Sequence, residues 1–160
     1  MIEIRRVDQD DWPIVRDVRL AALKDTPDWF WVTYEEEVHQ PEKWWRDFLT
    51  AAAWFVAYEA DRPVGIAAGI RSSRLDESER ALISMWVRPD ARRQGIGRQL
   101  VESTKEWARA DGALSLQLEV THTNLGATRL YERCGFKATG RTEPLPRDPS
   151  LIEHEMRLLL

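Results

Sequence analysis

The sequence predicts one mixed α/β domain, and three observations support this fold class. Segments that alternate apolar and polar side chains are interspersed with segments whose apolar residues recur at helical spacing. In the middle of the chain, over residues 81–110, a strand, a glycine-containing turn and a helix follow one another directly. At 160 residues the chain can bury a proper core, and it contains no internal repeat or low-complexity tract.

The N-terminal third is expected to begin with a strand and continue with helices. Residues 2–7 alternate apolar and charged side chains, which is typical of a strand. Asp10 or Asp11 can cap the helix that follows, and the segment Thr26-Pro27-Asp28 ends it. Two short helices are then predicted over residues 33–39 and 41–49.

The middle of the chain predicts strands. Apolar residues 52–58 and 64–70 flank a turn at Pro63, so we expect an antiparallel hairpin. Residues 71–80 are charged and lack an apolar period, which indicates a loop. Residues 81–87 form a short, partly β-branched apolar run that predicts a strand.

In the C-terminal part a helix is predicted over residues 96–110, followed by a strand over residues 114–120. Leu114, Leu116, Leu118 and Val120 share one face of that strand, so Glu119 points to the other. The remaining elements are a helix that Asn124 caps and Gly135 ends, a strand from Phe136, a proline-rich loop over residues 142–150, and a strand over residues 153–159.

The turn after residues 81–87 predicts an anion site. Pro89 stops the strand, and Arg92, Arg93 and Arg98 then surround two glycines at the start of the next helix. The first amides of a helix lack partners and carry partial positive charge, while arginines add charge-assisted hydrogen bonds. The pattern is neither a Walker loop, since no Gly-Lys-Ser/Thr follows, nor a dinucleotide fingerprint, since Leu100 replaces the third glycine. A plain turn with surface arginines is the remaining alternative.

Two motifs resemble those of the GNAT superfamily of N-acetyltransferases. The residues R-x-x-G-x-G at Arg92, Gly95 and Gly97 match the acetyl-CoA-binding motif, after a strand that ends M-W-V-x-P. The segment N-L-G-A-T-R-L-Y-E-R-C-G-F, from Asn124 to Phe136, resembles the later motif N-x-x-A-x-x-L-Y-E-x-x-G-F. The resemblance implies a single GNAT-like domain over residues 1–160, with a mixed, mostly antiparallel sheet flanked by helices and a splayed central strand pair.

The resemblance also implies acetyl-CoA as the acetyl donor. In the family, free backbone groups of the splayed strand bind pantetheine and polarise the thioester carbonyl, which assigns Met85, Trp86 and Val87 to the donor. The resemblance assigns binding of the pyrophosphate to Arg92, Arg93, Gln94, Gly95, Ile96, Gly97 and Arg98. Asn124 and Tyr131 complete the expected donor site, although Asn124 is equally explained as a helix cap.

Tyr131 matches the tyrosine that protonates the leaving thiolate in many family members. A phenol with a pKa of ~10 suits a thiolate whose conjugate acid titrates near ~8–9. The alternative is an aromatic side chain that packs on the helix face. The general base stays open between Glu119, a glutamate at position 36 or 37, and ordered water.

Residues 28–50 correspond to one wall of the acceptor site in the family. By that analogy Trp29, Phe30 and Tyr34 shape an acceptor pocket and Glu36 attracts an amine. Ordinary helix packing beside a solvated acidic face explains the same residues.

Composition narrows the function classes. A net charge of −4 argues against nucleic-acid binding, and no apolar run or signal peptide indicates a membrane partner. The single cysteine, Cys134, fits a reducing, cytoplasmic compartment, and the three histidines lack the spacing of metal ligands.

The function expected is therefore acetyl transfer from acetyl-CoA to a primary amine, by direct attack through a tetrahedral intermediate. The acceptor is a small molecule or a peptide, with small molecules favoured over proteins. An acetyl-CoA-binding sensor with little catalysis is the alternative. Many family members dimerise, so a homodimer is compatible with the sequence.

Overall fold

The structure, a computed structural model, describes residues 1–160 and centres on one seven-stranded sheet. The strands lie in the order β1-β2-β3-β4-β5-β7-β6, and all neighbours are antiparallel except the parallel pair β4 and β5. Their bounds are β1 Ile2–Val7, β2 Ala53–Glu59, β3 Arg62–Ile70, β4 Glu79–Val87, β5 Ser115–Thr121, β6 Lys137–Leu145 and β7 Asp148–Leu159. The mixed, mostly antiparallel sheet that the sequence resemblance implies is confirmed.

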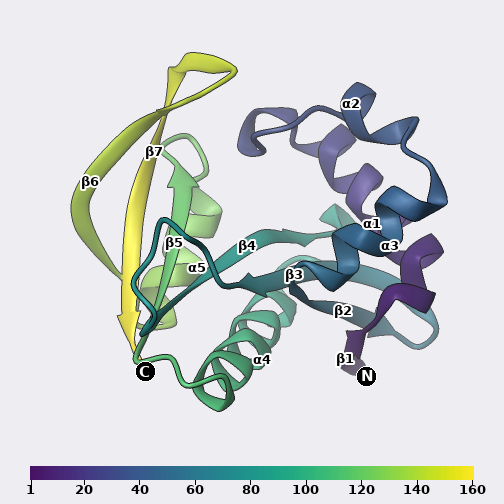
Figure 1. The fold of residues 1–160 in the computed structure, drawn as a ribbon, viewed down its shortest axis with the longest axis horizontal. Coiled ribbons are helices and arrows are strands. Elements are labelled where there is room, and N and C mark those ends of the chain that lie inside the picture. The colour runs from purple at the N-terminus through teal and green to yellow at the C-terminus, as the bar shows by residue number, and fades with distance from the viewer.

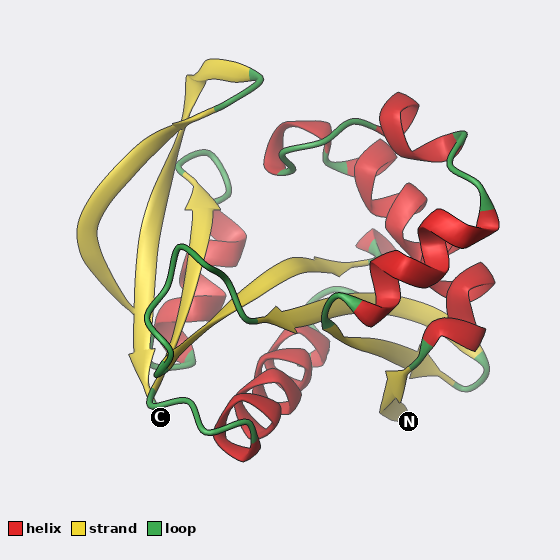
Figure 2. Ribbon diagram, viewed as in Figure 1, coloured by secondary structure: helices red, strands yellow, loops and turns green.

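Helices cover both faces of the β2–β4 part of the sheet (Figures 1 and 2). The helices are α1 Trp12–Asp25, α2 Tyr34–Val38, α3 Glu42–Thr50, α4 Ile96–Ala110 and α5 Leu125–Arg133. The first three gather on one face, and α4 lies against the opposite face with α5 beside it. None of them is long and apolar enough to cross a membrane.

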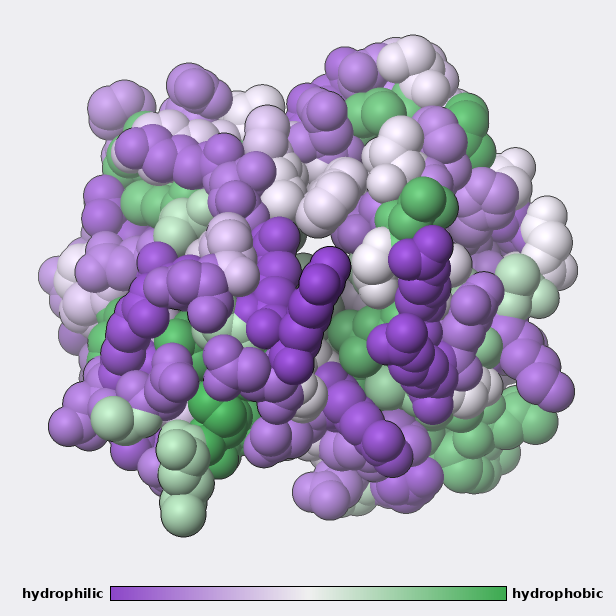
Figure 3. All heavy atoms as spheres, turned by 180° about the vertical axis from the view of Figure 1, so that it is seen from behind, coloured by the Kyte–Doolittle hydropathy of each residue, from purple (hydrophilic) through white to green (hydrophobic).

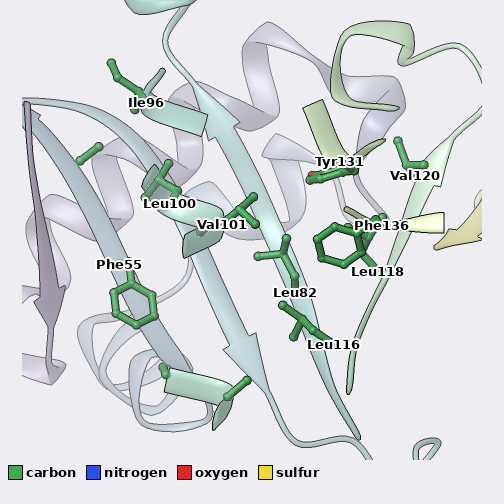
Figure 4. Close-up of a cluster of buried hydrophobic side chains, with 14 of the residues drawn as sticks. Phe55, Leu82, Ile96, Leu100, Val101, Leu116, Leu118, Val120, Tyr131 and Phe136 are labelled. Carbon is green, nitrogen blue, oxygen red and sulfur yellow. The ribbon is translucent and has the colours of Figure 1, made fainter. Parts of the chain in front are cut away.

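Two hydrophobic cores follow from this arrangement. One lies between the sheet and the α4–α5 side, and Figure 4 shows its side chains, among them Leu82, Leu100 and Leu116. The other lies under α1 and α3, where Trp45 and Trp54 are fully buried. Because both faces are covered, residues 53–58 of β2 are all buried instead of alternating.

The parallel strands β4 and β5 pair only at their beginnings. Cα partners run from Glu79↔Ser115 to Ala81↔Gln117, and the strands then diverge (Figure 1). A β-bulge in β4 falls at Ser84, whose φ is +58°, and bulges bend the strand that carries them. The closed end of the opening is fixed by Arg80, which is buried and donates to Asp111 at 2.8 Å. The splayed strand pair implied by the sequence resemblance is thus present.

The loop predicted over residues 142–150 is wrong, because β6 continues to Leu145 and β7 begins at Asp148. Pro144 pairs with Ile152 on the edge strand β6, where the missing N–H interrupts no ladder on the outer side. Pro149 lies in β7 before Glu153, the first residue that pairs with β5. Prolines in these places are compatible with strands.

Two smaller expectations also need correction. Leu114 precedes β5 and is 68% exposed, so it does not share the buried face of that strand. Asp11 occupies the N-cap position of α1 without a side-chain cap bond. Its carboxylate instead accepts from the Asp8 N–H at 2.9 Å, in a capping box that precedes the helix.

Candidate active site

The divergence of β4 and β5 opens a cavity of about 440 Å³. Its walls come from the bulged part of β4, the second half of β5 and the start of α5. Figure 3 shows the surface hollowed at the centre of the face seen from behind. The remaining walls are supplied by the segment 29–31, the loop 72–75 and the acidic faces of β6 and β7.

A row of unpaired backbone amides lies at the N-terminus of α4. The six backbone N–H groups from Arg93 to Arg98 donate to no acceptor within the chain. Arg93 and Gly95 both have positive φ, 63° and 80°, which turns this stretch outward before the helix begins. A Cβ on Gly95 would meet no atom within 4 Å, so the turn is open around this residue. The arrangement fits an anion such as a pyrophosphate.

The three arginines of the motif have different environments. Arg92 donates to the Val87 carbonyl at 2.9 Å and to the Asp25 carboxylate at 2.7 Å, so it joins the turn to α1. Arg93 and Arg98 are exposed and form no ion pair, which leaves their guanidinium groups available to a phosphate. The motif therefore combines one structural arginine with two unpaired ones.

Gly97 has a packing role that the sequence does not indicate. A Cβ at this position would stand 2.8 Å from Cδ2 of Leu130 in α5. The glycine therefore leaves room for the Leu130 side chain of α5, the helix that carries Tyr131.

The edge of β4 that faces β5 has no strand partner beyond Ala81. Met85 lines the cavity, whereas the Trp86 side chain is buried among α1 residues and donates to Asp25 at 2.9 Å. The Val87 carbonyl accepts from Arg92. Only the backbone of this segment, together with the Met85 side chain, faces the opening.

Tyr131 lines the cavity and is 6% exposed. Its ring lies between β4 and β5 and packs edge-on against Phe136 at 5.8 Å between centroids (Figure 4). Burial raises the pKa of the Tyr131 hydroxyl well above its ordinary value, and this hydroxyl makes no hydrogen bond within the chain. It is therefore a protonated, uncommitted donor at neutral pH.

Asn124 caps a helix and also lies at the cavity, as the sequence predicts. Its side-chain oxygen accepts from the Ala127 N–H at 3.2 Å, which confirms the N-cap of α5, and the residue also lines the cavity beside Tyr131.

Four glutamates share one face of the β5–β7–β6 sheet: Glu119, Glu143, Glu153 and Glu155. Strand register places Glu119 beside Glu155 and Glu143 beside Glu153. Glu155 accepts from Thr139 at 3.0 Å with Arg141 nearby, and Glu143 pairs with Arg74 at 3.2 Å. Glu119 and Glu153 have no cationic partner within 4 Å. They are thus the two uncompensated carboxyl groups of the cavity.

The two uncompensated carboxyl groups have raised pKa values. The pKa of Glu153 is raised to about 7, chiefly by burial. The Trp31 hydrogen bond lowers this pKa, and the charges of Glu119 and Glu143 raise it. Burial also raises the pKa of Glu119, with a contribution from Glu143. Sequence reasoning missed Glu153, whereas Trp31 belongs to the aromatic segment that the resemblance places at the acceptor pocket. The alternation of residues 153–159 predicts a strand but not which neighbour it pairs with.

The expected acceptor wall is only partly assembled. Trp29 and Phe30 line the cavity, but Tyr34 packs under the Lys24 ammonium at 4.7 Å from its ring centre, outside the cavity. The Glu36 carboxylate accepts from the Thr33 N–H at 2.7 Å in a capping box. The T-x-x-E spacing of these two residues could have predicted that role.

Glu37, the other candidate base of this segment, also has a structural partner. Glu37 is 3% exposed and pairs with Arg19 at 2.8 Å. Arg19 in turn donates to Oγ of Ser84 at the β4 bulge, at 2.9 Å. Neither Glu36 nor Glu37 lines the cavity, which leaves Glu119 as the one sequence-derived base candidate that does.

Comparison with known proteins gives a consistent family. The sequence model of the Acetyltransferase (GNAT) family matches residues 18–136. The chain is 30% identical over 144 residues to peptidyl-lysine N-acetyltransferase YjaB of Salmonella typhimurium, covering 89% of this chain and 88% of that protein. It is 41% identical over 73 residues to the bS18-alanine N-acetyltransferase of Escherichia coli, covering 45% and 48% of the two chains.

Solved structures share the fold. A GNAT acetyltransferase from Streptococcus pneumoniae superposes with a TM-score of 0.80 at 20% identity, over 100% of this chain and 99% of that one. The yncA protein of Salmonella typhimurium, solved with acetyl-CoA, gives a TM-score of 0.77 at 22% identity, over 100% and 94%.

Proposed function

The chain belongs to the GNAT family of acetyltransferases, and from this we propose that it transfers an acetyl group from acetyl-CoA to a primary amine of a small-molecule or peptide acceptor. Acetyl-CoA is the donor of the family, and the protein is an acyltransferase. The whole chain would act as one domain. The observation that carries the proposal is the run of six unpaired amides beside the splayed edge of β4.

The donor site follows from that geometry. The amides of residues 93–98 and the side chains of Arg93 and Arg98 would hold the pyrophosphate. The unpaired edge of β4 around Met85 to Val87 would accept and donate hydrogen bonds to the pantetheine arm, as an added strand does. When bound, acetyl-CoA supplies the acetyl group as a thioester.

Two side chains of the cavity would handle protons. A tyrosine hydroxyl is protonated at neutral pH, and burial raises the pKa of Tyr131 further, so this side chain holds a proton that it can donate to the departing thiolate. Glu119 faces the same cavity from β5 and would accept the proton that the nitrogen releases once it has attacked, directly or through water. Asn124 fixes the start of the helix that carries Tyr131.

Two features support an amine acceptor. The uncompensated carboxylates of the cavity favour a cation, and the names of two relatives specify peptidyl-lysine and an alanine of ribosomal protein bS18 as acceptors. Arg147, at the tip of the β6–β7 hairpin, donates to the carbonyls of Pro27 and Phe30 and so ties the hairpin to the segment that supplies one cavity wall. A tie on this side of the cavity would favour a small molecule or a slender peptide. A sensor without catalysis is less favoured, since Tyr131 and Glu119 both face the opening.

The test is acetyl-CoA binding by calorimetry, followed by thiol release in the presence of single acceptors. Lysine-containing peptides, N-terminal alanine peptides, simple monoamines and aminoglycosides are assayed separately. Binding with acceptor-dependent thiol release is the expected result. Binding without release across all acceptors would favour the sensor, and no binding would overturn both functions.

A further inference from the structure

Thr121 and Glu153 lie opposite each other on β5 and β7, at the inner end of the acidic face. Thr121 is 2% exposed, lines the cavity, and its Oγ1 has no hydrogen-bond partner. A buried hydroxyl without a partner is costly, so such a group indicates a ligand or water that completes it. This unpartnered hydroxyl adjoins a carboxyl group that lacks a cation.

Glu153 is 4% exposed, and one of its two oxygens is committed. Oε1 accepts from Nε1 of Trp31 at 2.7 Å, whereas Oε2 has no partner within the chain. Trp31 comes from the segment before α2, 122 positions away, and it fixes the orientation of the carboxyl group. Oε2 of Glu153 and Oγ1 of Thr121 are therefore two uncommitted acceptors on adjacent strands.

The charges around Glu153 favour a cation. Glu119 faces it from β5, Glu143 from β6 and Glu155 from its own strand, while Arg74 and Arg141 are the arginines that approach this face. Arg74 pairs with Glu143, and Arg141 lies 3.9 Å from Glu155. Four carboxyl groups against two guanidinium groups leave a negative surplus at Glu153 and Glu119.

We propose that Glu153 and Thr121 form the subsite for the ammonium group of the acceptor, and that Glu153 takes the proton which this ammonium loses before it attacks. One N–H bond of the ammonium breaks, one O–H bond forms at the carboxylate, and the electron pair stays on the nitrogen. The raised pKa of Glu153 suits a group that holds this proton near neutral pH. The inference rests on the proposed acetyl transfer to an amine and adds the residues that receive the acceptor.

Binding of an ammonium probe is measured first, without turnover. The protein is saturated with coenzyme A, which lacks an acetyl group, and titrated with Nα-acetyl-lysine methylamide and with n-butylammonium in a calorimeter. The variants are Glu153→Gln and Thr121→Val, with Glu155→Gln as the matched control, because it removes one charge from the same strand and face. We expect Glu153→Gln to weaken probe binding by about tenfold or more, from the loss of a charged hydrogen bond. Glu155→Gln should stay within about twofold, since that carboxylate is already partnered.

The pH dependence of kcat/KM separates proton uptake from simple positioning. The deficit of Glu153→Gln should be largest near pH 7 and should shrink as the pH approaches the pKa of the acceptor amine, because solvent then supplies the neutral amine. Three outcomes would each overturn the inference. Glu153→Gln could bind the probe as tightly as the wild type, its loss of kcat/KM could be constant with pH, or the wild type loaded with coenzyme A could fail to bind the probe. Failure to bind coenzyme A at all would instead overturn the proposed function, and the inference with it.

Discussion

Gly97 in α4 contacts Leu130 in α5 so closely that a Cβ on the glycine would stand 2.8 Å from Cδ2 of the leucine. Gly97 carries one of the six unpaired amides at this turn, and Leu130 directly precedes Tyr131. The glycine therefore leaves room, at the helix that begins the proposed donor site, for a side chain of the helix that carries the proposed acid.

Replacing this glycine tests the packing role. Gly97→Ala should destabilise the fold by about 1 kcal/mol, because the end of the Leu130 side chain must shift to admit the methyl group. Urea unfolding measures the loss. Gly126→Ala in α5 is the control, since its Cβ would meet nothing within 4 Å, and we expect it to be neutral or stabilising by up to ~1 kcal/mol. Equal stability of the two variants would contradict the packing role.

Gly95 tests the anion site separately from packing. Its φ of 80° makes Gly95→Ala strained by about 1 kcal/mol, and relief of that strain would turn the neighbouring amides away from their present directions. Acetyl-CoA affinity, measured by calorimetry, should fall by about tenfold as hydrogen bonds to the phosphates are disturbed.

Gly112→Ala is a close control for that variant. Its φ is 87°, its Cβ would also meet nothing, and it lies after the other end of α4. It should lose similar stability and keep its affinity. Equal loss of affinity in both variants would show that backbone strain, and not the position of Gly95, weakens binding.

Tyr131→Phe tests the proposed acid. The hydroxyl makes no hydrogen bond within the chain, so its removal leaves the packing against Phe136 intact. We expect kcat to fall by about 10²-fold, which is typical of a lost general acid, while the Kd for acetyl-CoA changes little. Thiol release under saturating donor measures kcat. Wild-type turnover by this variant would exclude the acid role.

Much of the fold can be predicted because its elements are local. The strand at residues 2–7 and the helix at residues 96–110 have the predicted bounds, since their apolar periods are unbroken. The strands around Pro144 and Pro149 escape prediction for a physical reason. A proline is disfavoured in a strand that pairs on both sides but tolerated at an edge, and which strand forms the edge depends on the whole topology.

The donor half and the acceptor half of the site also differ in how far the sequence predicts them. The donor half is a contiguous turn, so Gly95 and its neighbours can be recognised from sequence spacing alone. The acceptor half joins distant strands and the Trp31–Glu153 hydrogen bond, which spans 122 positions. Sequence proximity predicts the wrong acidic residues for this half. The glutamates nearest the aromatic residues are Glu36, which caps a helix, and Glu37, which pairs with Arg19.

The raised pKa of Glu153 predicts how stability depends on pH. The folded state binds this proton up to about pH 7, whereas an unfolded glutamate releases it near its ordinary value of 4.5. Between these values the native state holds more protons than the unfolded state, so the free energy of unfolding falls as pH rises.

Glu153→Gln cannot titrate, so the stability of the wild type relative to this variant should decrease between pH 5 and pH 8, by on the order of 1 kcal/mol. Urea midpoints of both proteins across this range measure the difference, in which titrations of the other groups largely cancel. A difference that stays constant, or that grows in favour of the wild type with rising pH, would mean that the Glu153 carboxyl group is ionised throughout and cannot hold the acceptor's proton.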